Sequence, residues 1–116
     1  MRSVLLIEDD ESIRDTVRLA LEFGRIPVEV ARNGREGLEL LARIERPGLI
    51  LLDMMMPVLD GCGFIKSLRR LPGLGKVPVV AMTAMGERAE ALPVAGVVTK
   101  PLDLRALLKV VNAYCA

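Results

Sequence analysis

Five polar side chains stand at or just beyond the ends of hydrophobic runs that have the length of a β-strand. They are Asp9, Asp10, Asp53, Thr83 and Lys100. Three carboxylates that lie close together repel one another, and a bound divalent cation relieves that repulsion. Mg2+ prefers a few carboxylate ligands together with water and phosphate oxygens, which is what these acids offer. The residue types therefore predict a magnesium site that handles a phosphoryl group.

Asp53 is the residue that we expect to react with phosphorus. A carboxylate can attack a phosphoryl group and form an aspartyl phosphate. Thr83 would supply a hydroxyl, and Lys100 a positive charge, to the oxygens of that group. For Asp9 and Asp10 the alternative is a simple cap of the helix that follows them.

Strand-like and helix-like segments alternate along the chain. Strands are predicted at residues 4–7, 26–31, 49–52, 77–82 and 96–99. Helices are predicted at residues 11–23, from 34 onward, at 61–70 and after Asp103. Residues 87–92 allow at most a short helix, because Pro93 interrupts any longer one.

This alternation predicts an α/β fold with helices on both faces of a parallel sheet. We expect a doubly wound, five-stranded, flavodoxin-like sheet in the order 2-1-3-4-5, with a short or missing fourth helix. In such sheets, ligands bind where the carboxyl ends of the strands meet. All five polar side chains are therefore placed at the same edge.

The length and composition predict one domain without an unusual surface charge. At 116 residues the chain builds a single core, so we expect one domain over residues 1–116. The 16 Lys and Arg residues against 15 Asp and Glu leave no large excess of either charge, so direct binding of nucleic acid or an anionic membrane is not predicted. No hydrophobic run suits a membrane span or a secretory signal, so we expect a cytoplasmic protein. The chain has no His, and its two Cys residues lack metal-ligand spacing, which argues against zinc or copper.

Taken in order, these motifs resemble the receiver domains of two-component response regulators. The resemblance covers nearly the whole chain, through the motifs Glu8-Asp9-Asp10, Asp53-Met-Met-Met-Pro57, Asp60-Gly61, Thr83-Ala84 and Lys100-Pro101. Each motif is weak alone, and their combination in this order is highly specific. The resemblance implies a signalling switch in which Asp53 accepts a phosphoryl group from a histidine kinase or a phosphotransfer protein. A downstream effector protein or a fused output domain would read its state.

The resemblance also implies a ligand set for Mg2+. Asp10 and Asp53 bind the ion together with the backbone carbonyl of Met55, and Asp9 contributes through a water molecule. It implies no enzymatic activity apart from the phosphorylation and dephosphorylation of the chain itself.

For the phosphoryl group, the resemblance implies that Thr83 moves toward it and that Lys100 pairs with it. The Lys100–Pro101 peptide bond is expected to be cis, as in the family. Val97 departs from the family, which usually has an aromatic residue three positions before this lysine. That departure and the short fourth helix favour an alternative, in which the chain is a receiver-like interaction module that acts without phosphorylation.

A third class is an enzyme on the same fold. A phosphatase with an aspartyl nucleophile carries a second acid two residues after the nucleophile, where this chain has Met55. A flavin protein would have a loop rich in Ser, Thr and Gly after the first strand, where this chain has three acids. Both kinds of enzyme are therefore less favoured than a receiver domain.

Overall fold

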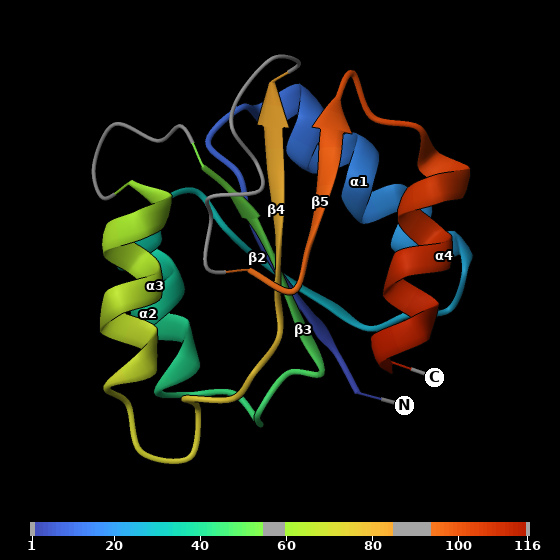
Figure 1. The fold of residues 1–116 in the computed structure, drawn as a ribbon. Helices are drawn as coiled ribbons and strands as arrows, with labels where there is room; N and C mark the ends of the chain where they lie inside the picture. Colours follow the sequence, from blue (N-terminus) through green and yellow to red (C-terminus); the bar gives the residue numbers. More distant parts are fainter. Residues whose placement is uncertain (1, 55–59, 85–93, 116) are drawn as a thin grey trace.

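The computed structural model describes residues 2–54, 60–84 and 94–115. Strands and helices alternate along the chain, as predicted (Figure 1). In chain order they are β1 (Val4–Ile7), α1 (Glu11–Phe23), β2 (Val28–Ala31), α2 (Gly34–Leu41), β3 (Leu49–Asp53), α3 (Gly61–Arg69), β4 (Val79–Ala84), β5 (Gly96–Lys100) and α4 (Leu104–Cys115).

The strands form one parallel sheet in the order β2-β1-β3-β4-β5. This confirms the predicted strand order and the doubly wound α/β class. β1 and β3 are buried along their whole length, as expected for unbroken hydrophobic runs inside a parallel sheet. All strands point toward the same edge, at the top of Figure 1, so the residues that follow them meet there.

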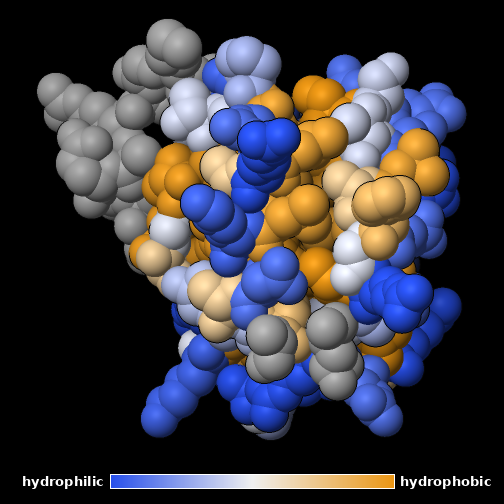
Figure 2. All heavy atoms as spheres, turned by 90° about the vertical axis from the view of Figure 1, so that its right-hand side faces the viewer, coloured by the Kyte–Doolittle hydropathy of each residue, from blue (hydrophilic) through white to orange (hydrophobic). Residues whose placement is uncertain are grey.

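Helices cover both faces of the sheet. α2 and α3 lie on one face, and α1 and α4 lie on the other (Figure 1). The outer surface of α1 and α4 includes hydrophobic side chains (Figure 2). Within the described ranges, no helix combines the length and the apolar character that crossing a membrane requires. The predicted short or missing fourth helix falls at residues 87–92, outside the described residues.

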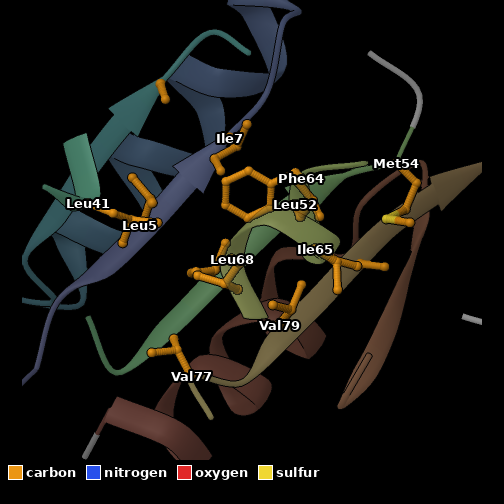
Figure 3. Packing of buried hydrophobic residues seen from close by; sticks show 13 residues of the cluster. Leu5, Ile7, Leu41, Leu52, Met54, Phe64, Ile65, Leu68, Val77 and Val79 are labelled. Carbon is orange, nitrogen blue, oxygen red and sulfur yellow. The ribbon is translucent and has the colours of Figure 1, made fainter. Parts of the chain in front are cut away.

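Each face of the sheet has its own hydrophobic core, because successive strand residues point to opposite sides. Leu5 and Ile7 of β1 belong to the core under α2 and α3, into which Phe64 of α3 packs (Figure 3). Leu6 belongs to the core under α1 and α4. Gly37 of α2 permits close packing, since a Cβ at this position would lie 2.6 Å from Ile7 Cδ1.

Prolines explain why two strands begin later than predicted. β2 begins at Val28 and β4 at Val79, each two residues after the predicted start. Pro27 and Pro78 directly precede these strands and have no N–H to donate to a neighbouring strand. Their carbonyls still accept hydrogen bonds, at 2.9 Å from the N–H of Val4 and at 3.0 Å from the N–H of a β3 residue.

Side-chain caps begin the helices. The caps are Asp10, Asn33, Asp60 and Asp103, and each accepts a hydrogen bond from a backbone N–H in the first turn of its helix. These contacts satisfy amide groups that have no partner within the helix. Short polar residues therefore set where each helix starts relative to the strand before it.

Candidate functional site

Three carboxylates converge at the carboxyl edge of the sheet. Glu8 and Asp9 are the first residues after β1, and Asp53 is the last residue of β3. β1 and β3 are adjacent, with Ile7 beside Leu52, so the acids that follow these residues are neighbours. One carboxylate oxygen from each acid lies within 4.8 Å of the corresponding oxygens of the other two. Negative charge is therefore concentrated at this point.

Lys100 brings a positive charge into this acidic cluster. Its ammonium Nζ lies 2.9 Å from Glu8 Oε1 and 3.4 Å from Asp53 Oδ1. Lys100 is the last residue of β5, which is separated from β3 by β4, so its long side chain spans the distance. Burial by itself would lower the pKa of Lys100, but the carboxylates of Glu8 and Asp53 outweigh burial and raise that pKa. The ammonium group therefore stays charged.

Glu8 and Asp9 are adjacent in the sequence but differ in environment. Glu8 is fully buried, whereas Asp9 is exposed. Burial raises the pKa of Glu8 to about 7, with a further increase from Asp53 and an opposing effect from Lys100. Burial would also raise the pKa of Asp9, but hydrogen bonding with Asp53 and Glu8 outweighs burial and lowers that pKa. Without a cation, Glu8 therefore tends to hold a proton near neutral pH while Asp9 stays ionised.

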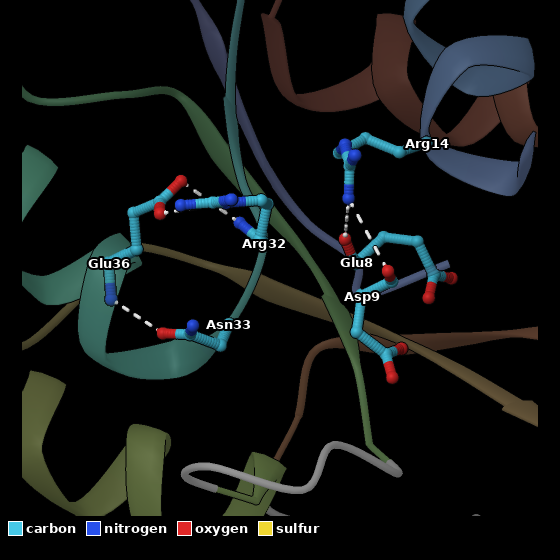
Figure 4. Close-up of polar contacts among 6 residues, drawn as sticks. All are labelled: Glu8, Asp9, Arg14, Arg32, Asn33 and Glu36. Carbon is cyan, nitrogen blue, oxygen red and sulfur yellow. Dashed lines mark hydrogen bonds and ion pairs between the residues drawn. The ribbon is translucent and has the colours of Figure 1, made fainter. Parts of the chain in front are cut away.

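Arg14 of α1 fixes the backbone that carries these two acids. Its guanidinium Nη1 donates to the backbone carbonyl oxygen of Glu8 at 3.0 Å and to that of Asp9 at 3.4 Å (Figure 4). The contact ties the β1–α1 connection to α1. Arg14 is absent from the predicted site, because its spacing alone does not distinguish it from Arg18, the other arginine of α1. The signal that could have identified Arg14 is its place near the start of α1, the helix that follows the acids at the end of β1.

Asp10 lies outside the cluster of three carboxylates, and its role as a magnesium ligand stays a prediction. Its side chain caps α1, where Oδ1 accepts a hydrogen bond from the backbone N–H of Ile13 at 3.0 Å. Its own backbone N–H donates to Glu8 Oε2 at 3.2 Å. Because β1 ends at Ile7, the acids that reach the cluster are Glu8 and Asp9, one residue earlier than the predicted pair.

The remaining predicted residues are placed as follows. Thr83 lies on β4, one residue beyond Met82, which pairs with Asp53 across β3 and β4. Thr83 is 3% exposed, and its role toward a phosphoryl group stays a prediction. Met55, with its predicted carbonyl ligand, lies outside the described residues. The Lys100–Pro101 peptide bond is cis, as the resemblance implies.

The donor set of the cluster fits a hard divalent cation. Its side-chain donors are carboxylate oxygens, and the chain contains no His that would favour a softer metal. With the three acids ionised and Lys100 charged, the negative charges exceed the positive one by two, which suits a divalent ion. Asp9 is the exposed acid of the three, so a cation with its water ligands can reach it from solvent.

Comparisons with known proteins agree with this geometry. A family model described as the response regulator receiver domain matches residues 4–112. Response regulator MprA of Mycolicibacterium vanbaalenii is 36% identical over 110 residues, which are 90% of this chain and 46% of that protein. An uncharacterized 14.6 kDa protein of Leptolyngbya boryana is 38% identical over 117 residues, which cover 97% of this chain and 88% of that protein. The chemotaxis response regulator CheY4 of Vibrio cholerae has a TM-score of 0.88 at 29% identity, with 98% of each chain covered.

The length of these relatives is also informative. This chain spans about half the length of most of the curated response regulators that it matches. One of them is the DNA-binding dual master transcriptional regulator RpaA of Synechocystis, which is 33% identical and of which 48% is covered. The similarity therefore concerns one domain of those proteins.

Proposed function

The chain is a receiver domain of the two-component response regulator family, and from that premise we propose that Asp53 is its phosphoacceptor. Receiver domains act as phosphorylation switches, generally depend on Mg2+ and are not classical enzymes. In this proposal, a histidine kinase or a phosphotransfer protein donates the phosphoryl group. Phosphorylation then changes how the chain binds a downstream effector or a fused output domain.

The transfer step makes one bond and breaks one. An oxygen of the Asp53 carboxylate attacks phosphorus, while the bond between phosphorus and the leaving group of the donor breaks. The electron pair of the broken bond departs with the donor, which takes up a proton from solvent where it needs one. Lys100, which pairs with Asp53 at 3.4 Å, would bind an oxygen of the transferred group. The Thr83 hydroxyl would bind a second oxygen.

Asp9 and Asp53 are the proposed side-chain ligands of Mg2+. Glu8 instead forms an ion pair with Lys100. Glu8 Oε1 pairs with Lys100 at 2.9 Å, and its Oε2 accepts a backbone hydrogen bond at 3.2 Å, so both oxygens already have protein partners. The carbonyl of Met55 remains the predicted backbone ligand. Bound Mg2+ would neutralise negative charge on Asp53 and on the phosphoryl oxygens.

The contact of Lys100 with both Glu8 and Asp53 is the observation that carries this proposal. The three residues come from the ends of three different strands and meet within ion-pair distance. Asp53 is 3% exposed, which is unusual for a carboxylate whose only role is to cap a helix or face solvent. Such convergence of charged, buried groups is typical of a functional site.

Intact-mass measurement tests the proposal directly. The protein is incubated with Mg2+ and a small phosphoryl donor such as acetyl phosphate. We expect one added phosphoryl group, which is lost with a chelator and in Asp53→Asn. Asp103→Asn is the matched control, because Asp103 caps α4 and Asn preserves that cap. An adduct that persists in Asp53→Asn would assign the acceptor to another residue.

A second pair of variants separates the cation ligand from the helix cap. Asp9→Asn is expected to weaken Mg2+ binding by about tenfold or more, because it removes a charged ligand. Asp10→Asn is expected to leave Mg2+ affinity nearly unchanged, since Asn caps a helix about as well as Asp. Calorimetric titration of both variants with Mg2+ provides the comparison. The opposite ranking would assign the ligand role to Asp10, as the resemblance implies.

An interaction module that acts without phosphorylation is the second candidate, and Val97 favours it. Val97 lies on β5 with 36% of its surface exposed, where the family usually has an aromatic residue. If no phosphoryl group is gained from several donors in the presence of Mg2+, this candidate becomes the better description.

A further inference from the structure

Two connections concentrate positive charge at the edge where the strands begin, opposite the edge that carries the acidic cluster. They are residues 42–48, between α2 and β3, and residues 70–78, between α3 and β4, at the bottom of Figure 1. Their charged residues are four cations and one acid, namely Arg43, Arg46, Arg70, Lys76 and Glu45. All five are exposed, and among the residues that the structure describes none of them takes part in an ion pair. The cations therefore outnumber the acid and are available to an anion from solvent.

A hollow with a volume of about 380 Å3 lies between these two connections. Arg46 of one connection and Lys76 of the other line it, together with Leu71, Gly73 and Gly75. The volume falls within the range of small-molecule pockets, about 300 to 1,000 Å3. Both cations lie more than one helical turn beyond the helix that precedes them, so they do not serve to complement the dipole of that helix. Their positive charges therefore face the hollow without a role in helix stability.

A turn in the α3–β4 connection fixes one wall of the hollow. The backbone N–H of Leu74 donates to the carbonyl oxygen of Leu71 at 3.2 Å. Pro72 and Gly73 are the two central residues of this turn, and Gly73 has a φ of 77°, which glycine adopts without strain. Proline followed by a residue with positive φ is characteristic of a type II turn. The hydrogen bond and the proline ring restrict this wall, so binding of a ligand costs little conformational entropy there.

The backbone of the same connection offers N–H groups that have no partner. Arg69 Nη1 donates to the carbonyl oxygens of Gly75 and Val77, at 2.9 Å each, so these acceptors are already engaged. The N–H groups of Gly73, Gly75 and Lys76 donate to no acceptor among the described residues. Each of these three residues lines the hollow. Backbone N–H groups beside cationic side chains are the donors that bind phosphate oxygens in proteins.

We propose that this hollow binds the phosphate chain of a free oligophosphate, either an inorganic chain or the chain of a nucleoside di- or triphosphate. The planar guanidinium of Arg46 would bind two phosphate oxygens, and Lys76 would add a compact charge. The N–H groups without a partner would bind further oxygens. None of the described residues that line the hollow is aromatic, so a nucleobase finds no ring to stack on, and the phosphates provide the recognition. The site is distinct from Asp53, which lies at the opposite edge of the sheet, and it requires no Mg2+.

Calorimetric titration of the full chain with tripolyphosphate, in metal-free buffer at low ionic strength, tests the site. We expect saturable binding that weakens by about tenfold or more in Arg46→Gln/Lys76→Gln, because this double variant removes two charged hydrogen-bond donors. Arg105→Gln/Lys109→Gln is the matched control, since it removes the same two kinds of charge from exposed positions on α4 and should bind like the wild-type chain. Equal losses in the two double variants would reflect net charge alone and would overturn the proposal. Absence of binding by the wild-type chain would overturn it as well.

Amide NMR spectra show where the anion binds. We expect the signals of Gly73, Gly75 and Lys76 to shift most when tripolyphosphate is added. Largest shifts around Asp53 and Lys100 would instead place the anion at the acidic edge and contradict the proposed site. Asp53→Asn should bind tripolyphosphate as well as the wild-type chain does, so failure of this site and failure of phosphorylation at Asp53 are measured separately.

Three further ligands identify the chemistry that the hollow recognises. Tighter binding of tripolyphosphate than of ATP would point to an inorganic chain as the source, and tighter binding of ATP would point to a nucleotide. Adenosine should not bind, and an affinity for adenosine comparable to that for ATP would exclude recognition through the phosphates. A peptide rich in Glu that binds as tightly as tripolyphosphate would assign the hollow to acidic protein segments and overturn the proposal.

Discussion

Glu8 in the acidic cluster at the carboxyl edge and Phe64 in the core beneath α3 are both fully buried, yet burial has opposite consequences in the two regions. Glu8 and Phe64 both have 0% exposure. Removing the ring of Phe64 from water stabilises the folded chain by about 2 to 3 kcal/mol. Removing the carboxylate of Glu8 from water disfavours its charged form and raises its pKa to about 7. The core therefore supplies the stability that holds an otherwise unfavourable cluster in place.

This difference shows how the chain separates stability from chemistry. The core needs only hydrophobic side chains of suitable volume, which pack from both sides on β1 and β3. The cluster needs individual partners, namely Lys100 for the carboxylates and Arg14 for the backbone that carries them. Substitutions in the core should therefore lower stability, whereas substitutions in the cluster should alter cation binding and pH response.

The largest effect is expected from Phe64→Ala. Phe64 is fully buried, and truncation leaves a cavity, so the free energy of unfolding should fall by about 3 to 5 kcal/mol. Phe23→Ala is the matched control, because Phe23 is 92% exposed and its loss should change stability little. Urea denaturation followed by circular dichroism measures both variants. Similar losses in the two variants would mean that burial does not explain the contribution of Phe64.

The pH dependence of the stability of the metal-free protein should reveal the titration of Glu8. The folded-state pKa of Glu8 is raised from 4.5 to about 7, so the folded chain binds more protons than the unfolded chain between these values. Stability should therefore decrease as pH rises through this window, by at most about 3 kcal/mol. The lowered pKa of Asp9 and the raised pKa of Lys100 act outside this window, since their ordinary values are 3.8 and 10.5.

Urea denaturation in chelator at several pH values measures this slope. Glu8→Gln should flatten it, and added Mg2+ should reduce it by favouring the ionised acids. A stability that rises with pH between 4.5 and 7 in the wild-type chain would contradict the burial of Glu8 as its cause.

Arg14→Ala should have an intermediate effect that is specific to the cluster. Loss of the contacts to the carbonyls of Glu8 and Asp9 frees the backbone that positions both acids. Mg2+ affinity should fall by about tenfold, which is typical for partners that orient metal ligands. Arg18→Ala on the same helix removes only a half-exposed ion pair with Asp15 and should leave the affinity unchanged. Calorimetric titration with Mg2+ compares the two variants. Equal losses of Mg2+ affinity would refute a positioning role for Arg14.

The smallest effect, and one of opposite sign to that in the core, is expected from Asp53→Asn. Removing one of three repelling carboxylates should raise the stability of the metal-free protein at pH 8 by about 1 kcal/mol. Thermal unfolding in chelator measures the change. Addition of Mg2+ should stabilise the wild-type chain more than the variant, because the variant lacks a charged ligand. A destabilised variant would indicate that the pairing of Lys100 with Asp53 outweighs the repulsion.

Local patterns in the sequence are sufficient to predict most of the elements. Unbroken hydrophobic runs identify β1 and β3, and caps such as Asn33 and Asp103 identify helix starts. The two late strand starts follow from Pro27 and Pro78, which have no N–H to donate to a neighbouring strand. Asp53 and Lys100 could be placed at one edge because all strands of a parallel sheet end on the same side.

The choice between neighbouring acids depends on the folded chain. Residue types and order establish that acids follow β1, but whether Asp10 caps a helix or joins the cluster depends on where β1 ends relative to β3. A shift of one residue reverses the direction of a side chain in an extended segment, so three consecutive acids are not separable by composition. The contact of Arg14 with two carbonyls and the exposure of Phe23 likewise arise from the packing of α1 on the sheet. Periodicity and caps thus define the elements, while strand pairing and helix packing select the side chains that meet.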